Sequence, residues 1–281
     1  MEKKLNLTGS TADNKRSMII KRKAISNRHD QIISLIKASG FASVEEMAKK
    51  FNVTPQTIRR DINRLDEDGY IARYHGGAGL CVSTENVDYR HRKELLLDEK
   101  RKIAQMVASM IQDNTSLFIN IGTTTEYVAE ELVSHNKKLR IITNNLNVAA
   151  SMSKKQDFEV IVAGGIVRSQ DCGVTGEAAV KFIRQFKVDV GIIGISGIEL
   201  DGTLLDFDFK EVYVARAIIE NSRKVYLVAD HSKFGRNAMV KLGHIKEIDT
   251  LITDKAPPEQ LIEVLRNNDV NLKLAQETLE N

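Results

Sequence analysis

The stretch TPQTIRRDI at residues 54–62 decides the fold of the N-terminal part of the chain. Thr54 suits the N-cap of a helix, and Pro55 suits its first position, where the missing N–H costs nothing. Ile58, Ile62 and Leu65 then recur at helical spacing, which predicts a buried stripe along one side. The polar and basic residues between them are left on the other sides of this helix, where a partner can reach them.

Two shorter helices are predicted upstream of this one. Apolar residues between 32 and 36 fit one face of a helix that begins near Arg28. Ser43 and Glu46 have capping-box spacing and open a second helix, which ends in a short turn at residues 52–53. Three short helices with a tight turn between the last two predict a helix-turn-helix, whose second helix enters the major groove of DNA. The alternative is a helix pair used for protein contacts.

The polar side chains of this region have the chemistry that reads DNA. Gln and Asn can pair with adenine, Arg can pair with guanine, and Thr and Arg can hold phosphates. Residues 70–75, ahead of Gly76 and Gly77, alternate weakly and predict a small β-wing along the DNA backbone. Asp61 is expected to hold a nearby basic side chain instead of facing DNA. We therefore expect DNA contacts from Ser43, Thr54, Gln56, Thr57, Arg59, Arg60, Asn63, Arg64, Arg73 and His75.

Composition is that of a folded protein with about two domains. The chain has 281 residues, of which 42% are hydrophobic and 28% charged. Residues 1–80 carry a net charge of +6, whereas the remainder carries −3. A basic head on a mildly acidic body is typical of a polyanion-binding module, although an ordinary solvated surface also fits a charge of this size.

Several classes of protein are not expected from this sequence. No run approaches the ~18 apolar residues of a membrane-spanning helix, and the polar N-terminus lacks the apolar centre of a secretory signal. We therefore expect a cytoplasmic protein. Cys81 and Cys172 lie far apart and the six His residues are scattered, so neither a disulfide framework nor a metal site is predicted. No cofactor is expected.

Beyond residue 97, short apolar runs alternate with amphipathic stretches. This pattern predicts an α/β fold with a mostly parallel sheet covered by helices on both faces. Strands are expected at 116–121, 140–143, 158–162, 188–194, 224–229 and 250–253, and helices at 98–111, 124–134, 146–152, 178–186, 210–221 and 258–268. The predicted organisation is a disordered tail at 1–22, a winged helix-turn-helix at 23–80, a linker at 81–97 and the α/β domain at 98–281.

Small and polar residues follow five successive strands of this predicted sheet, and ligands of parallel sheets bind at the carboxyl ends of the strands. A glycine followed by hydroxyls at a helix start, as at 122–125, can hold an anion, although a plain threonine N-cap fits the same pattern. We expect a small phosphorylated ligand, with acids accepting hydrogen bonds from its hydroxyls and Lys233 as counter-charge. The expected ligand-binding residues are Gly122, Thr123, Thr124, Thr125, Asn144, Asn145, Arg168, Gly197, Asp201, Asp206, Lys210, Glu211 and Lys233.

These motifs resemble those of the DeoR family of bacterial repressors. Arg28, Ile32 and Ile36, followed after 17 residues by TPQTIRRDI, resemble its DNA-binding signature, and the likeness extends over residues 25–275. The resemblance implies an effector domain related in fold to ribose-5-phosphate isomerase and glucosamine-6-phosphate deaminase. It also implies homo-dimers or tetramers that bind double-stranded operator DNA at two half-sites and leave it when a small phosphorylated effector binds. The first 22 residues depart from the family pattern.

Four runs are similar to those of family members that repress genes for glycerol and glycerol 3-phosphate use. They are TNNLNVA (143–149), GIIGISGIELDGTLLDFD (191–208), RAIIENSR (216–223) and DHSKFGRNAMV (230–240). We therefore expect glycerol 3-phosphate as the effector. Another sugar phosphate is the alternative, because the predicted site residues do not discriminate between such ligands.

An enzyme acting on sugar phosphates is the rival interpretation. The carboxylate and amine types that an aldose–ketose isomerase needs for proton transfer are present in Asp201, Asp206, Asp208, Lys210, Glu211 and Lys233. A fused operator-binding head argues against catalysis, because a sensor needs only a different affinity for its ligand in two states. The sequence therefore predicts a regulator with no catalytic residue.

Overall fold

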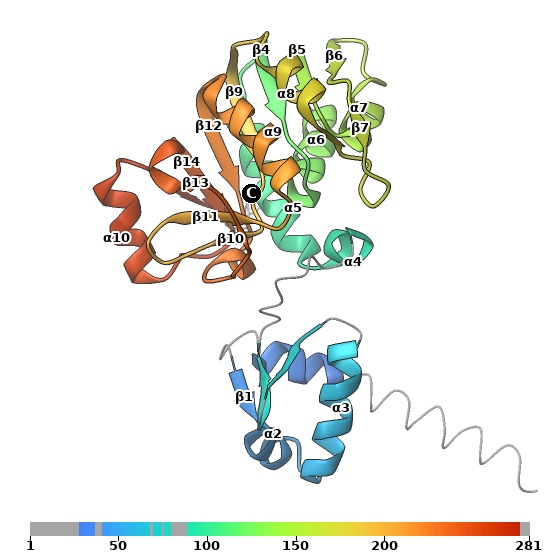
Figure 1. Cartoon of the computed structure of the whole chain (residues 1–281), viewed down its shortest axis with the longest axis vertical. Helices are drawn as coiled ribbons and strands as arrows, with labels where there is room; N and C mark the ends of the chain where they lie inside the picture. Colours follow the sequence, from blue (N-terminus) through green and yellow to red (C-terminus); the bar gives the residue numbers. More distant parts are fainter. Residues whose placement is uncertain (1–27, 37–40, 68–69, 75, 80–88, 276–281) are drawn as a thin grey trace, which may run out of the picture. The chain divides into compact units, whose positions relative to one another are not determined.

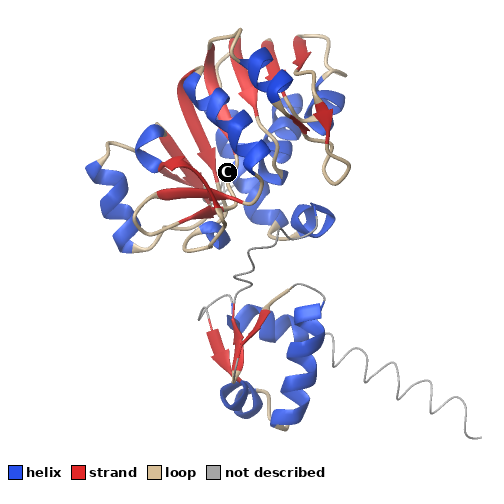
Figure 2. Cartoon of the chain, in the orientation of Figure 1, coloured by secondary structure: helices blue, strands red, loops and turns tan. Residues whose placement is uncertain are grey.

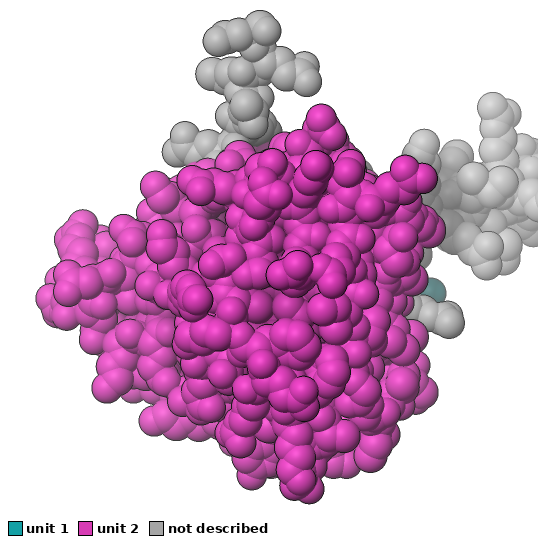
Figure 3. Space-filling model, turned by 90° about the horizontal axis from the view of Figure 1, so that it is seen from above, with its two compact units in different colours: residues 1–83 teal, residues 84–281 magenta. Residues whose placement is uncertain are grey.

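The computed structural model describes residues 28–36, 41–67, 70–74, 76–79 and 89–275 (Figure 1). The chain divides into two compact units, Met1–Ser83 and Thr84–Asn281, and each is described by itself. The second unit is shown in magenta in Figure 3. The predicted tail at 1–22 and the predicted DNA contact His75 lie outside the described residues.

The first unit is a winged helix-turn-helix. Residues 28–36 form a helix, followed by α2 (Val44–Lys50) and α3 (Pro55–Glu67), with Asn52 at a φ of +50° in the turn between them. The predicted stripe of Ile58, Ile62 and Leu65 is buried in the core that the three helices share. The wing is an antiparallel sheet in the order β1 (Phe41–Ser43), β3 (Gly77–Gly79) and β2 (Ala72–Tyr74).

Asp61 has the structural role that the sequence predicts. It is 6% exposed, and its carboxylate accepts hydrogen bonds from Arg28 Nε at 2.6 Å and Arg28 Nη2 at 3.2 Å. His29 Nε2 lies 3.1 Å from the same carboxylate. These contacts tie the first helix to the middle of α3.

Within the described residues, the second unit is built on a seven-stranded sheet whose paired strands all run parallel. Its strand order is β15 (Asn271–Leu274), β14 (Thr250–Thr253), β12 (Ser222–Val228), β9 (Val188–Ile193), β4 (Thr115–Ile119), β5 (Leu139–Thr143) and β6 (Phe158–Val162). All the predicted strands are present, and β15 was not predicted.

Helices cover both faces of this sheet (Figure 2). Along β4, Phe118 faces one side, while Leu117 and Ile119 face the other, as the alternation of a strand requires. The side of Leu117 is covered by α5 (Leu97–Met110), α6 (Thr123–Ser134) and α7 (Leu146–Met152). The side of Phe118 is covered by α8 (Glu177–Ile183), α9 (Phe209–Glu220) and α10 (Glu259–Asn267).

The winding of the sheet reverses between β4 and β9. From β4 the chain adds β5 and β6 on one side, whereas β9, β12, β14 and β15 follow one another on the other side. The loops that leave β4 and β9 therefore turn to opposite faces of the sheet and open a crevice between the carboxyl ends of these two strands.

Three features of the second unit were not predicted. A small antiparallel sheet begins after β9 in the chain. It consists of β10 (Gly197–Ile198), β11 (Thr203–Asp206) and β13 (Val240–His244). A hairpin of β7 (Ile166–Val167) and β8 (Val174–Thr175) follows β6. Helix α4 (Tyr89–Glu94) forms within the segment 81–97 that was predicted to be a linker, because six residues are too short to show an apolar period.

We expect the ion pair between Asp61 and Arg28 to stabilise the first unit. Asp61→Ala leaves Arg28 partly buried without its counter-charge and should lower the free energy of opening this unit by about 3 kcal/mol. Hydrogen–deuterium exchange of α2 and α3 in the full chain measures this loss. The exposed Asp30→Ala is the control, and equal exchange rates in the two variants would contradict the role given to Asp61.

Candidate functional site

The exposed side of α3 carries the residues predicted to contact DNA. Gln56, Arg59, Arg60, Asn63 and Arg64 are all exposed along this helix. Because they lie opposite the buried stripe of Ile58, Ile62 and Leu65, the helix can present them without disturbing its own core.

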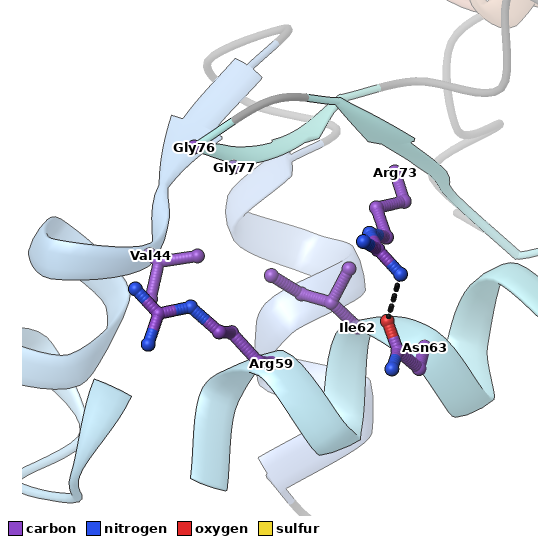
Figure 4. Close-up of a pocket in the computed structure, with 7 residues that line it drawn as sticks. All are labelled: Val44, Arg59, Ile62, Asn63, Arg73, Gly76 and Gly77. Carbon is purple, nitrogen blue, oxygen red and sulfur yellow. Dashed lines mark hydrogen bonds between the residues drawn. The ribbon is translucent and has the colours of Figure 1, made fainter. Parts of the chain in front are cut away.

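The wing adds a basic side chain to this surface. Arg73 projects from β2 toward α3, and its Nη1 donates a hydrogen bond to Asn63 Oδ1 at 3.0 Å (Figure 4). Arg59, Asn63 and Arg73 border a hollow of about 340 Å³ between α3 and the wing. A concave basic surface between a helix and a wing suits the ridge of a DNA backbone beside the major groove.

The predicted hydroxyl contacts are occupied in helix capping. Ser43 Oγ donates to Glu46 Oε2 at 2.9 Å and accepts from Glu46 N at 3.2 Å. Thr54 Oγ1 accepts from Thr57 N at 3.2 Å and lies 2.9 Å from Thr57 Oγ1. These side chains shape the starts of α2 and α3, so any phosphate contact has to share groups that already cap a helix.

A cavity of about 50 Å³ lies in the second unit, at the crevice where the sheet reverses its winding. The segment after β4 contributes residues 120–124 and the segment after β9 contributes residues 194–196. The remaining lining residues come from α4, β11, α9, β12 and the segment after β12: Arg92, Asp206, Glu211, Ala215, Val228, Lys233 and Arg236.

Three basic side chains, Lys233, Arg236 and Arg92, line this cavity and are called its basic wall. Lys233 lies 4.0 Å from the buried carboxylate of Asp230, and burial lowers the pKa of Lys233 while Asp230 opposes that shift. Arg236 lies over the ring of Phe207 at 5.0 Å from its centroid. The first turn of α6 adds backbone N–H groups, because its N-cap Gly122 supplies no side-chain cap.

Two acidic side chains, Asp206 and Glu211, also line the cavity and are called its acidic wall. Asp206 accepts a hydrogen bond from Ser196 Oγ at 2.8 Å, and burial raises its pKa. Burial and the nearby charge of Asp206 raise the pKa of Glu211 to about 7. The cavity is therefore lined by both cations and acids.

Arg168 lies behind the acidic wall and does not line the cavity. Its guanidinium bonds Asp171 at 2.9 Å, Asp208 at 2.9 Å and also Glu211. One arginine thus binds three carboxylates.

The structure brings Gly122, Thr123, Thr124, Asp206, Glu211 and Lys233 together around this cavity. The other predicted residues lie outside its lining. Thr125 Oγ1 donates to the carbonyls of Asn120 and Gly122 and so shapes the turn before α6. Asn145 caps α7 and donates to Glu126, while Asn144 donates to the carbonyl of Val174.

Gly197, Asp201 and Lys210 also lie away from the cavity lining. A Cβ on Gly197 would come within 2.1 Å of the carbonyl oxygen of Arg236, so glycine lets the segment that carries Arg236 approach. Asp201 accepts from Thr203 N in a tight turn, and Lys210 is exposed beside the ring of Phe209.

Two basic lining residues, Arg92 and Arg236, were missed from the sequence. Arg236 ends the polar run after β12, so its place beyond a strand end was a usable signal. Arg92 lies in the segment predicted to be a linker, where the short helix α4 gives no signal of a site.

Two absences apply to the part of the chain that the structure describes. It contains no group of three or more His, Cys, Asp or Glu side chains placed to hold a metal ion. None of its helices combines the length and the apolar composition needed to cross a membrane.

A winged helix-turn-helix joined to an α/β unit with a polar cavity at its switch point defines a DNA-binding regulator with a sensor domain. Residues 28–84 match the DeoR-like helix-turn-helix domain, and residues 96–255 match the DeoR C terminal sensor domain. The chain belongs to the DeoR family and is a DNA-binding transcriptional repressor. This confirms the predicted fold class and family, and a regulator rather than an enzyme.

Two relatives are similar over nearly the whole chain. The glycerol-3-phosphate regulon repressor of Escherichia coli (strain K12) is 52% identical over 247 residues, covering 88% of this chain and 98% of that protein. The repressor of the same name from Haemophilus influenzae is 49% identical, covering 88% and 96%. Ribose 5 phosphate isomerase A from Neisseria gonorrhoeae overlays only loosely, with a TM-score of 0.37 and 17% identity over 51% of this chain and 54% of that chain.

The acidic wall predicts a pH dependence of stability. Glu211 titrates at about pH 7 in the folded protein and near pH 4.5 otherwise, so the folded state holds an extra proton between these values and loses stability as the pH rises through them. Glu211→Gln should remove on the order of 2–3 kcal/mol of this loss between pH 5 and pH 8. Urea unfolding at both pH values measures it. The exposed Glu263→Gln is the control, and parallel pH profiles for wild type and Glu211→Gln would contradict the assignment.

Proposed function

We propose that this chain represses genes for glycerol and glycerol 3-phosphate use, and that it leaves its operator when glycerol 3-phosphate binds the cavity between β4 and β9. The names of the two relatives that share 52% and 49% of its sequence support the regulon. The observation that carries the proposal is the mixed charge of the cavity lining, which combines the cations Lys233, Arg236 and Arg92 with the acids Asp206 and Glu211.

The two walls match the two ends of glycerol 3-phosphate. Its phosphate takes the basic wall, against the first turn of α6 and the cations of Lys233, Arg236 and Arg92. Its hydroxyls donate hydrogen bonds to Asp206 and Glu211. At about 50 Å³ the cavity has to widen for any of these ligands, and glycerol 3-phosphate requires less widening than the larger pentose and hexose phosphates.

On the operator side, α3 enters the major groove. Gln56, Arg59, Arg60, Asn63 and Arg64 lie on its exposed side, where base edges and flanking phosphates would be met. Arg73 follows the backbone from the wing.

The operator-bound form in this proposal is an oligomer of the chain, because one recognition helix reads only one half-site. Four apolar side chains on the α8–α9 side of the sheet are 56–74% exposed: Ile166, Phe209, Tyr213 and Met239. They leave on the order of 500 Å² of apolar surface in water, which approaches the ~800 Å² that each partner buries in a standard interface.

Phe209 and Tyr213 lie in the first turns of α9, and Ile166 and Met239 lie on segments linked to the residues before it. The rings of Phe209 and Tyr213 meet edge to face with centroids 6.3 Å apart. Arg168, two residues after Ile166, bonds Asp208 beside Phe209 at 2.9 Å. Met239 precedes Val240, which pairs with Asp206 across the small sheet. A second copy of the chain is the partner proposed for this surface.

Two substitutions separate the operator and effector functions. Arg59→Ala should weaken operator binding by about tenfold to a hundredfold, because it removes one DNA contact worth ~1–3 kcal/mol, and should leave ligand affinity unchanged. Arg236→Gln should do the reverse and give a repressor that is not released. Calorimetry with glycerol 3-phosphate and mobility shifts on operator DNA measure the two affinities.

The matched control for Arg236→Gln is Arg223→Gln, which lies outside the cavity lining and pairs at 3.7 Å with Asp189 on the sheet surface. A folded variant that lost both functions would contradict the separation into two units. Stronger binding of ribose or fructose phosphates than of glycerol 3-phosphate would show that the effector is another sugar phosphate.

We expect a charge placed in this exposed apolar surface to weaken the association of two chains. Tyr213→Asp should shift the chain toward monomers, because a carboxylate in an apolar interface has to lose its water. Light scattering after size exclusion measures the mass. Leu200→Asp, on the turn between β10 and β11, is the control, and an unchanged mass for Tyr213→Asp would place the interface elsewhere.

A further inference from the structure

Lys100 is a buried cation that neither the DNA-binding face nor the cavity lining uses. It lies in the first turns of α5 and is 3% exposed. Its Nζ donates hydrogen bonds to the carbonyl oxygen of Leu95 at 2.7 Å and to the carbonyl oxygen of Arg92. Both carbonyls belong to the C-terminal end of α4 or the residue just beyond it, where helix carbonyls have no intrahelical partner and attract a cation.

The helix that Lys100 holds also lines the effector cavity. Arg92 is its contribution, and Arg92 Nη2 lies 3.9 Å from the buried carboxylate of Asp171, which in turn binds Arg168 behind the acidic wall. The side chain of Arg92 therefore belongs to the cavity, while its main chain is bound by Lys100.

Helix α4 is also bound to α6, whose first turn contributes to the cavity lining. Tyr89 Oη donates to Glu126 Oε2 at 2.6 Å, and Lys93 Nζ lies 3.6 Å from the same carboxylate oxygen. Helix α4 lies beside α5 and α6 in Figure 1. Helix α4 is therefore held by α5 through Lys100 and by α6 through Glu126.

Charged side chains around the cavity also affect the pKa of Lys100. Burial lowers the pKa of Lys100 to about 8, Asp230 opposes this shift, and Lys233 and Arg92 add to it. An anion among Lys233, Arg236 and Arg92 would offset the repulsion between these cations and Lys100. It would thereby strengthen the hold of the ammonium group on the α4 carbonyls.

We propose that Lys100 is a positioning residue that couples the effector cavity to α4, so that a phosphorylated effector drawn to Arg92 fixes α4 and thereby alters the segment leading to the DNA-binding unit. The coupling rests on the proposed function, because it requires an anionic effector in this cavity. Helix α4 is the first described element of the sensor domain after the DNA-binding unit, so a signal carried along the chain has to pass through it.

Hydrogen–deuterium exchange of the wild-type full chain, with and without glycerol 3-phosphate, tests this coupling directly. The proposal predicts slower exchange both in residues 120–124, which line the cavity, and in α4. Protection of 120–124 with unchanged exchange in α4 would overturn the coupling and leave the proposed effector intact. No protection anywhere, with no heat of binding, would contradict the proposed effector itself.

Lys100→Met removes the ammonium group and keeps a long apolar side chain. Operator affinity without effector should stay within about threefold of wild type, and effector affinity should also be little changed. Release by effector should fall from about a hundredfold to less than about fivefold, because the coupling free energy is lost. Mobility shifts and calorimetry on the same samples measure the three quantities.

Lys137→Met is the matched control. Lys137 Nζ donates to the carbonyl oxygens of Ala108, at 2.6 Å, and Ile111, at the end of α5, so it binds helix-end carbonyls as Lys100 does but outside the cavity lining. Release should stay at the wild-type level in this variant. Equal loss of release in both variants would show a general effect of destabilising α5, and normal release in Lys100→Met would refute the coupling.

Discussion

The structure of the sensor domain depends on one constraint, which is that all the paired strands of its main sheet run parallel. Parallel strands need crossovers, so every helix returns the chain over one face and brings the strand carboxyl ends to a common edge. Because the winding reverses between β4 and β9, the loops after these strands diverge and open the crevice that holds the cavity. The small sheet of β10, β11 and β13 begins after β9 in the chain, and its strand β11 supplies Asp206.

Charged groups in the crevice have nearby partners. Glu211 is bound by Arg168, Asp206 accepts a hydrogen bond from Ser196 Oγ, and Lys233 lies 4.0 Å from Asp230. Buried charges need partners, since each loses its water on folding. A ligand with an anionic end and a hydroxyl-bearing end supplies partners to both walls at once, so its binding can favour one conformation over another.

Much of this fold was predictable from local patterns. The capping residues Ser43 and Thr54 and the stripe of Ile58, Ile62 and Leu65 specify the helix-turn-helix, because caps and periodicity act within a few residues. The rule that ligands bind at strand carboxyl ends led to Gly122, Asp206, Glu211 and Lys233, although the sequence gives no distances between them.

The rest depends on contacts that no local pattern reveals. Asn144 and Asn145 follow a strand as the other site residues do, but their amides are used to close β5 onto β8 and to cap α7. Arg92 reaches the cavity because Lys100 and Glu126 hold a six-residue helix in place, and that helix is too short to show an apolar period. A polar side chain at a strand end is therefore a candidate, and only the packing around it shows whether it faces the ligand.

In the proposed function, one ligand in the cavity controls one operator-binding surface. To lower operator affinity a hundredfold, the ligand has to prefer the state that does not bind DNA by about 2.7 kcal/mol. A few charge-assisted hydrogen bonds can supply this preference. Fluorescence anisotropy of the full chain on DNA from a glycerol-catabolic promoter, at fixed salt and with rising glycerol 3-phosphate, measures it directly. We expect the chain to bind this DNA tightly. Glycerol 3-phosphate should release it, and ribose or fructose phosphates should not. Tight binding that is unchanged by glycerol 3-phosphate would contradict it.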